Sequence, residues 1–153
     1  MTPSRYRIDL DLHVASGAAF VVLGGLVAAV SRPLDVVKGS WLAAYLVLVV
    51  GVALVVIGAA QQQLDTPVEP RIRTCQLAGW GIANILVITG SLSSNPAITD
   101  AGSVLLFVTL ILTAWIGKPL LRTRRIAACL YIGVLTVLAV SVPIGSALAH
   151  TGT

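Results

Sequence analysis

Residues 41–60 read WLAAYLVLVVGVALVVIGAA, a run of twenty residues without a charged side chain. An α-helix rises about 1.5 Å per residue and the hydrocarbon core of a bilayer is about 30 Å thick, so a run of this length can cross it. In water such a helix would have no polar face to expose. The stretch therefore predicts a transmembrane helix and sets the fold class.

Four further apolar stretches extend from about 12–30, 74–92, 101–117 and 126–149. The connections between them are short and contain the prolines and polar residues that end helices. Asn95-Pro96 is typical of a helix N-cap followed by proline in the first turn. We expect an all-α integral membrane bundle of five transmembrane helices, with residues 1–153 forming a single transmembrane domain.

The composition agrees with a lipid environment. Hydrophobic residues make up 57% of the chain, charged residues 10%, and the mean hydropathy is +0.96. Soluble domains carry about 25% charged residues. The net charge of +4 does not indicate a nucleic-acid partner, because the cations lie at the ends of apolar segments rather than on a charged soluble face.

The distribution of cations predicts the orientation. With five crossings, one side holds Arg5, Arg7, Arg71, Arg73, Lys118, Arg122, Arg124 and Arg125, and the other holds Arg32 and Lys38. Cytoplasmic loops carry the excess of Lys and Arg, so the N-terminus is expected in the cytoplasm and the C-terminus outside. The preference for arginine over lysine, with abundant Ala, Val and Gly, suggests the inner membrane of a prokaryote.

The connection at 118–125 carries four of these charges, which we expect to contact anionic lipid head groups: Lys118, Arg122, Arg124 and Arg125. Each is worth about 1 kcal/mol near a negative membrane surface. The alternative to lipid contact is that this segment docks an acidic cytoplasmic partner.

Small residues predict the faces on which helices pack. Ala44, Gly51 and Gly58 recur every seven residues, and Gly79 and Ala83 lie four apart. Packing within the monomer is the first expectation, and packing against other membrane subunits or a second copy is the alternative. Cys75 and Cys129 each open a predicted span and are expected to be buried small residues.

One polar face lies within the predicted membrane. Gln76, Trp80 and Asn84 lie four residues apart and share a side of the third span. A buried amide must find a partner, and Thr109, Thr113 or Thr136 could supply it for Asn84. The face is expected to bond neighbouring helices, and lining of a solute or lipid cavity is the alternative.

Ionisable groups are absent from the depth of every predicted span, which argues against ion-coupled transport through a buried carboxylate. Asp9, Asp11 and His13 form a D-x-D-x-H run, which is expected to cap the first span rather than hold a metal. His150 would lie about 30 Å from His13, too far to clamp one haem. We therefore predict no metal, no cofactor and no catalytic residue.

The aromatic residues Tyr6, Trp41, Trp80, Trp115 and Tyr131 fall mostly near span ends and predict an interfacial belt. The leading functional hypothesis is a non-enzymatic accessory, assembly or interaction subunit of a larger membrane complex. The alternative is a homo-oligomeric channel or facilitator for a small solute, with Gln76, Trp80 and Asn84 lining its path. A weaker alternative is a lipid- or quinone-binding protein of a respiratory membrane.

Overall fold

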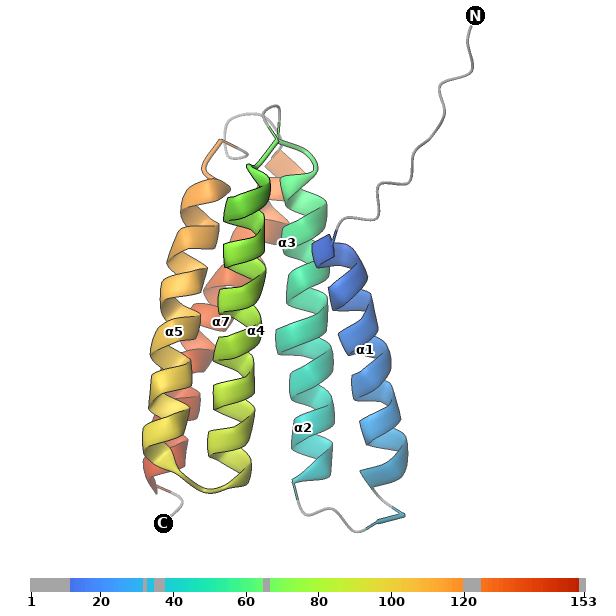
Figure 1. Ribbon diagram of the computed structural model, residues 1–153, viewed down its shortest axis with the longest axis vertical. Coiled ribbons are helices and arrows are strands. Elements are labelled where there is room, and N and C mark those ends of the chain that lie inside the picture. The colour runs from blue at the N-terminus through green and yellow to red at the C-terminus, as the bar shows by residue number, and fades with distance from the viewer. Residues whose placement is uncertain (1–11, 32, 35–37, 65–66, 120–124, 152–153) are drawn as a thin grey trace, which may run out of the picture.

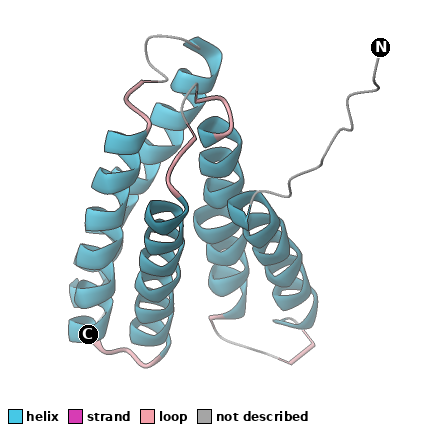
Figure 2. Cartoon of the chain, turned by 45° about the horizontal axis from the view of Figure 1, so that its top comes forward, coloured by secondary structure: helices cyan, strands magenta, loops and turns pink. Residues whose placement is uncertain are grey.

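The computed structural model describes residues 12–31, 33–34, 38–64, 67–119 and 125–151, and within these ranges the only regular elements are helices. Four of them are single helices: α1 (Leu12–Ser31), α4 (Pro70–Leu92), α5 (Pro96–Ile116) and α7 (Arg125–Thr151). A fifth rod is continuous but has three parts: α2 (Gly39–Tyr45), the π-helical η1 (Leu46–Val52) and α3 (Ala53–Gln61). Figures 1 and 2 show these rods side by side in a bundle. The all-helical prediction is confirmed.

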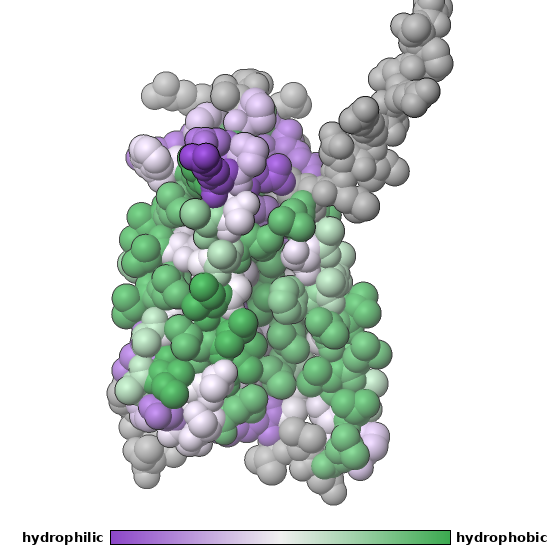
Figure 3. Space-filling view, in the orientation of Figure 1, coloured by the Kyte–Doolittle hydropathy of each residue, from purple (hydrophilic) through white to green (hydrophobic). Residues whose placement is uncertain are grey.

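Four of the rods in the described part of the chain are long and apolar enough to cross a membrane: α1, Gly39–Gln61, α4 and α5. In α7, the apolar stretch within the described side chains covers Ala128–Ser141. In Figure 3 apolar side chains form a broad band around the visible face, with polar residues gathered at its two ends. This distribution is what a multi-pass membrane protein requires.

Local sequence explains where two of the helices begin. The side chain of Asn95 accepts a hydrogen bond from the Ile98 backbone N–H at 3.4 Å, and Pro96 occupies the first turn of α5. This confirms the predicted cap. Pro70 likewise opens α4, where its missing N–H costs nothing because the first-turn donors have no helical acceptor.

The bundle contains two closely packed pairs. α1 packs along the rod formed by α2, η1 and α3, and α4 packs along α5. α7 contacts both α5 and α3 and so joins the pairs. The start of α1, the α3–α4 junction and the α5–α7 junction lie at one end of the bundle, and the end of α7 lies at the other (Figure 1).

Glycine allows both pairs to approach at backbone distance. A Cβ on Gly17 would lie 2.6 Å from the carbonyl oxygen of Gly51, and one on Gly51 would lie 2.9 Å from the nitrogen of Val21. In the second pair, a Cβ on Gly102 would lie 2.7 Å from the nitrogen of Val87. Because there is no hydrophobic force between helices in lipid, such close van der Waals contact is one source of cohesion, together with hydrogen bonds between helices.

The π-helical η1 changes which face of the second rod meets α1. A seven-residue spacing keeps Ala44 within about 20° of Gly51 on a regular α-helix, whereas a π-turn absorbs about one residue of rotation. Ala44 is accordingly exposed, and Ala43 is buried with its carbonyl oxygen 3.0 Å from a Cβ built on Gly24. Gly51 and Gly58 remain in contact with α1.

Two other expectations need correction. Cys75 and Cys129 are exposed on the outside of the bundle, so the prediction that they are buried was wrong. A thiol tolerates an apolar surround, so packing does not force it inward. Trp41 and Trp115 are exposed, but Trp80 and Tyr131 are buried in the core and belong to no interfacial belt.

Candidate functional site

A chain of buried polar side chains crosses four helices near one end of the bundle. The Gln61 amide nitrogen at the end of α3 donates to the Gln76 amide oxygen on α4 at 3.1 Å. The Gln76 nitrogen donates to the Thr113 hydroxyl on α5 at 2.7 Å. The Tyr131 hydroxyl on α7 donates to the Thr113 carbonyl oxygen. We refer to Gln61, Gln76, Thr113 and Tyr131 as the polar network.

Every member of the polar network is withdrawn from the surface. Gln61 is 6% exposed, Gln76 2%, Thr113 0% and Tyr131 3%. A buried amide or hydroxyl group that lacks a hydrogen-bond partner lowers the stability of the folded protein by about 1–3 kcal/mol. The network therefore fixes the relative rotation of α3, α4, α5 and α7, because few arrangements pair all of these groups at once.

The direction of the hydrogen bonds in the network follows from Thr113. Its hydroxyl donates to the Thr109 carbonyl oxygen at 2.8 Å, so the same oxygen accepts from Gln76. Gln76 must then present its amide nitrogen to Thr113 and its oxygen to Gln61. Gln61 in turn uses its nitrogen, which leaves its Oε1 as a buried acceptor with no partner among the described residues.

A second polar contact joins α2 to α4. The Tyr45 hydroxyl donates to the Asn84 Oδ1 at 2.8 Å, and the Asn84 amide nitrogen donates to the Trp80 carbonyl oxygen, also at 2.8 Å. The Tyr45 ring stacks on Trp41 with a centroid separation of 5.3 Å. The threonines proposed as partners for Asn84 are thus replaced by a tyrosine from the second rod. Trp80 Nε1 is buried and has no partner in the described part of the chain.

The predicted polar face is therefore inside the protein. Gln76, Trp80 and Asn84 are 2%, 1% and 3% exposed. The two amides hold hydrogen bonds to other helices, and the Trp80 ring lies in the hydrophobic core.

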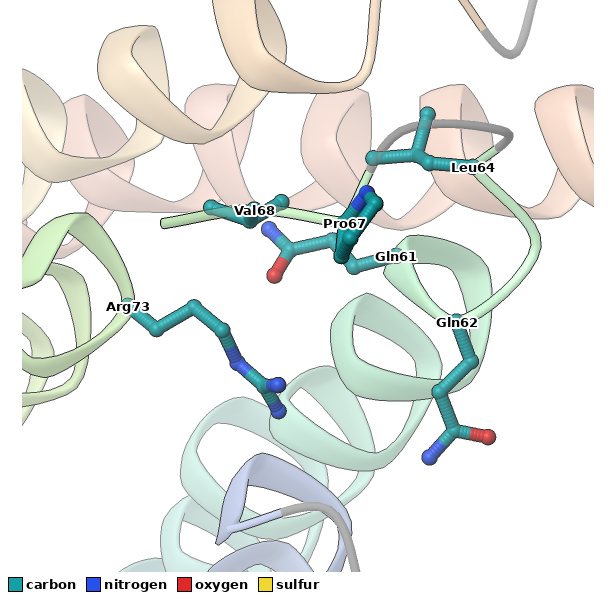
Figure 4. A pocket seen from close by; sticks show the side chains of 6 residues that line it. All are labelled: Gln61, Gln62, Leu64, Pro67, Val68 and Arg73. Carbon is teal, nitrogen blue, oxygen red and sulfur yellow. The ribbon is translucent and has the colours of Figure 1, made fainter. Parts of the chain in front are cut away.

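A small pocket lies beside the end of the network. Its volume is about 200 Å³, and its lining residues come from the end of α3, the α3–α4 connection and the start of α4: Gln61, Gln62, Leu64, Pro67, Val68 and Arg73. Figure 4 shows the Gln61 amide and the Arg73 guanidinium projecting into the same space from the two helices. Gln61 thus belongs to both the polar network and the pocket.

The remaining predicted residues are distributed as follows. Ala83 is fully buried against α5, and a Cβ on Gly79 would lie 3.0 Å from the Thr109 hydroxyl. Lys118 is exposed just after α5. Arg122 and Arg124 lie outside the described residues, and Arg125 opens α7 with a side chain that is also outside them.

Of the histidine and aspartate candidates, the structure describes the side chain of His13 alone. His13 is buried in the first turn of α1, with its Cβ 2.9 Å from one built on Gly58. Asp9, Asp11 and the His150 side chain fall outside the described residues. Among the side chains that the structure does place, no three of His, Cys, Asp and Glu gather closely enough to hold a metal ion.

Sequence reasoning missed three residues that complete these contacts: Gln61, Tyr45 and Tyr131. Gln61 opens the polar run Gln61-Gln62-Gln63 and looks like the first residue of a loop. Tyr45 and Tyr131 look like interfacial aromatics. The available signal was the hydroxyl of each tyrosine, since a buried phenol needs a hydrogen-bond partner.

No protein family, curated protein or solved structure matches this chain.

Proposed function

We propose that this chain is a non-enzymatic interaction subunit of a larger membrane assembly, which binds its partner through the outer face of α1. The partner is expected to be a transmembrane helix of another protein. The observation that carries the proposal is the sparse burial of α1. Only 17% of its most apolar window is buried, against 33% to 39% for the other three candidate spans.

The free face of α1 has the side chains that favour close helix contact. Ala18, Gly25 and Ala29 lie on one exposed stripe with Val22, and a Cβ on Gly25 would meet nothing within 4 Å. Small residues allow another helix to approach, and in lipid this close packing supplies association energy. The inner face of α1 is already occupied by the second rod.

The burial of the polar face supports this proposal over a channel. A solute path along Gln76, Trp80 and Asn84 would require these side chains to be open to the solute. In the structure each is at most 3% exposed, and both amides are engaged by neighbouring helices. The polar groups thus serve cohesion, while the apolar exterior remains available for contact with lipid and protein.

Purification from native membranes tests the proposal. The wild-type chain in mild detergent is expected to carry a second protein in fixed stoichiometry, measured by native mass spectrometry. Gly25→Trp should release that protein. Gly133→Trp is the matched control, because Gly133 on α7 is also exposed with open space around its Cβ. An isolated monomer, a homo-oligomer of this chain alone, or equal loss in both variants would contradict the proposal.

We also propose a cytoplasmic N-terminus in the inner membrane of a prokaryote. The arrangement of the rods supports a shared side for the α3–α4 and α5–α7 junctions, where the cations are concentrated. With both native cysteines replaced by serine, a membrane-impermeant maleimide should label Ser40→Cys from outside intact cells. Lys118→Cys should react only after the membrane is opened. The reverse labelling would invert the topology.

A further inference from the structure

We infer that the pocket between the ends of α3 and α4 binds the head group of an anionic phospholipid that carries a free hydroxyl, such as phosphatidylglycerol. The hydroxyl would donate to Gln61 Oε1, and the phosphate would lie beside Arg73. This inference is independent of the proposed partner of α1, because it concerns a different surface.

The need for a donor comes from the polar network. Thr113 sets the direction of every hydrogen bond back to Gln61, so the group left over at the pocket is an acceptor and not an N–H. Gln61 is 6% exposed, and its Oε1 has no partner among the described residues. Figure 4 shows this oxygen on the side of the amide that faces Arg73. A ligand that completes the network must therefore offer an O–H or N–H.

The need for an anion comes from the charge at this end of the bundle. Arg73 lines the pocket, Arg71 is exposed two residues before it in α4, and Lys118 is exposed just after α5. In the sequence, Arg122, Arg124 and Arg125 fall in or just after the connection that follows α5, and the acids of the segment between α3 and α4 are Asp65 and Glu69. An excess of cations attracts anionic head groups. A hydroxyl satisfies the acceptor without adding the positive charge that an amine would bring.

The size and walls of the pocket agree with a head group at the membrane surface. Its volume of about 200 Å³ is below the roughly 300–1,000 Å³ of pockets for drug-sized ligands. Leu64, Pro67 and Val68 give it an apolar wall, along which the glycerol backbone of a lipid can lie. The site lies where α3 ends and α4 begins, at the level where phosphates are found if the apolar rods span the hydrocarbon.

The first test uses the unmodified protein, delipidated in mild detergent, with lipid binding titrated by native mass spectrometry. Dioleoyl phosphatidylglycerol is compared with dioleoyl phosphatidylmethanol, which has the same charge but no head-group hydroxyl. We expect phosphatidylglycerol to bind about fivefold more tightly, the ratio that one neutral hydrogen bond supplies. Equal binding of the two lipids would overturn the inference.

Two matched variants separate the pocket from general charge attraction. Arg73→Gln removes the cation that lines the pocket, and Arg71→Gln removes an exposed cation outside its lining. Arg73→Gln is expected to weaken both anionic lipids severalfold more than Arg71→Gln does. Equal weakening would show that only surface charge matters and would refute the site.

Gln61→Met removes the acceptor and should reduce the ratio of phosphatidylglycerol to phosphatidylmethanol affinity from about fivefold to about one. A preference that survives this change would place the hydroxyl elsewhere and contradict the assignment. Glycerol 3-phosphate distinguishes a soluble ligand from a lipid. If it bound as tightly as phosphatidylglycerol, the occupant would be a free phosphate ester, and the lipid assignment would fail.

Discussion

Gln76 is the central residue of the polar network, and its replacement gives the sharpest test of what holds the bundle together. Gln76→Met keeps a flexible side chain of similar length but removes both the acceptor for Gln61 and the donor to Thr113. Hydrogen bonds between membrane helices are worth about 0.6 kcal/mol on average and up to about 1.7 kcal/mol. The two lost bonds should therefore lower the free energy of unfolding by about 1–3 kcal/mol.

A double variant tests whether the Gln61 and Gln76 amides stabilise the protein through their contact with each other. Gln76→Met leaves the Gln61 amide buried without its acceptor, whereas Gln61→Met with Gln76→Met removes both amides. Replacing both partners of a buried hydrogen bond by apolar groups is close to neutral compared with removing one. The double variant should therefore be no less stable than Gln76→Met alone.

Reversible unfolding by titration of a denaturing detergent into mild micelles, followed by far-ultraviolet circular dichroism, measures these differences. Loss of less than about 0.5 kcal/mol in Gln76→Met would mean that the network contributes little cohesion, below the average for one such bond. Strictly additive losses in the double variant would mean that Gln61 and Gln76 do not interact.

Three further predictions use the same unfolding measurement. Tyr45→Phe should lower the free energy of unfolding by about 0.6–1.7 kcal/mol. When Asn84 is already replaced by Leu, Tyr45→Phe should cause almost no further loss, because each change removes the same hydrogen bond. Full additivity of the two losses would disprove the pairing. Gly17→Ala should cost about 1–3 kcal/mol by overpacking, whereas Gly25→Ala, whose Cβ meets open space, should be neutral or slightly stabilising. Tyr131→Phe should weaken the attachment of α7 by about 1 kcal/mol, and an unchanged midpoint would remove this tyrosine from the network.

The fold could be predicted from the sequence because each span is a long apolar run with polar or proline-containing ends. The run at 41–60 lies within the observed rod Gly39–Gln61, and the cap at Asn95 is where the dipeptide Asn95-Pro96 indicated. In both cases the deciding interactions lie within one segment of the chain. The apolar period and the cap geometry are local, so no knowledge of neighbouring helices was needed.

The partners within the site could not be predicted, because they depend on the rotation of one helix against another. Asn84 was expected to meet a threonine, since threonines are the obvious polar residues on α5 and α7, but Tyr45 reaches it from the other side. Gln61 looked like a loop residue because the apolar run ends just before it. Its burial depends on Gln76, which arrives from a different helix, and on Tyr131, whose side chain approaches that of Gln61.

The π-turn at η1 has a consequence for how one rod serves two polar contacts. Sixteen residues separate Tyr45 from Gln61, and on an uninterrupted α-helix they would point roughly 160° apart. Absorbing one residue of rotation reduces this angle to roughly 60°, so that both can reach α4, one at Asn84 and the other at Gln76. The widened turn thus changes the rotation of the rod about its axis so that both side chains face α4. Deleting a single residue between positions 46 and 52 would leave fifteen residues of regular α-helix between the two side chains, which gives the same angle of roughly 60°, so both contacts with α4 should survive without the widened turn.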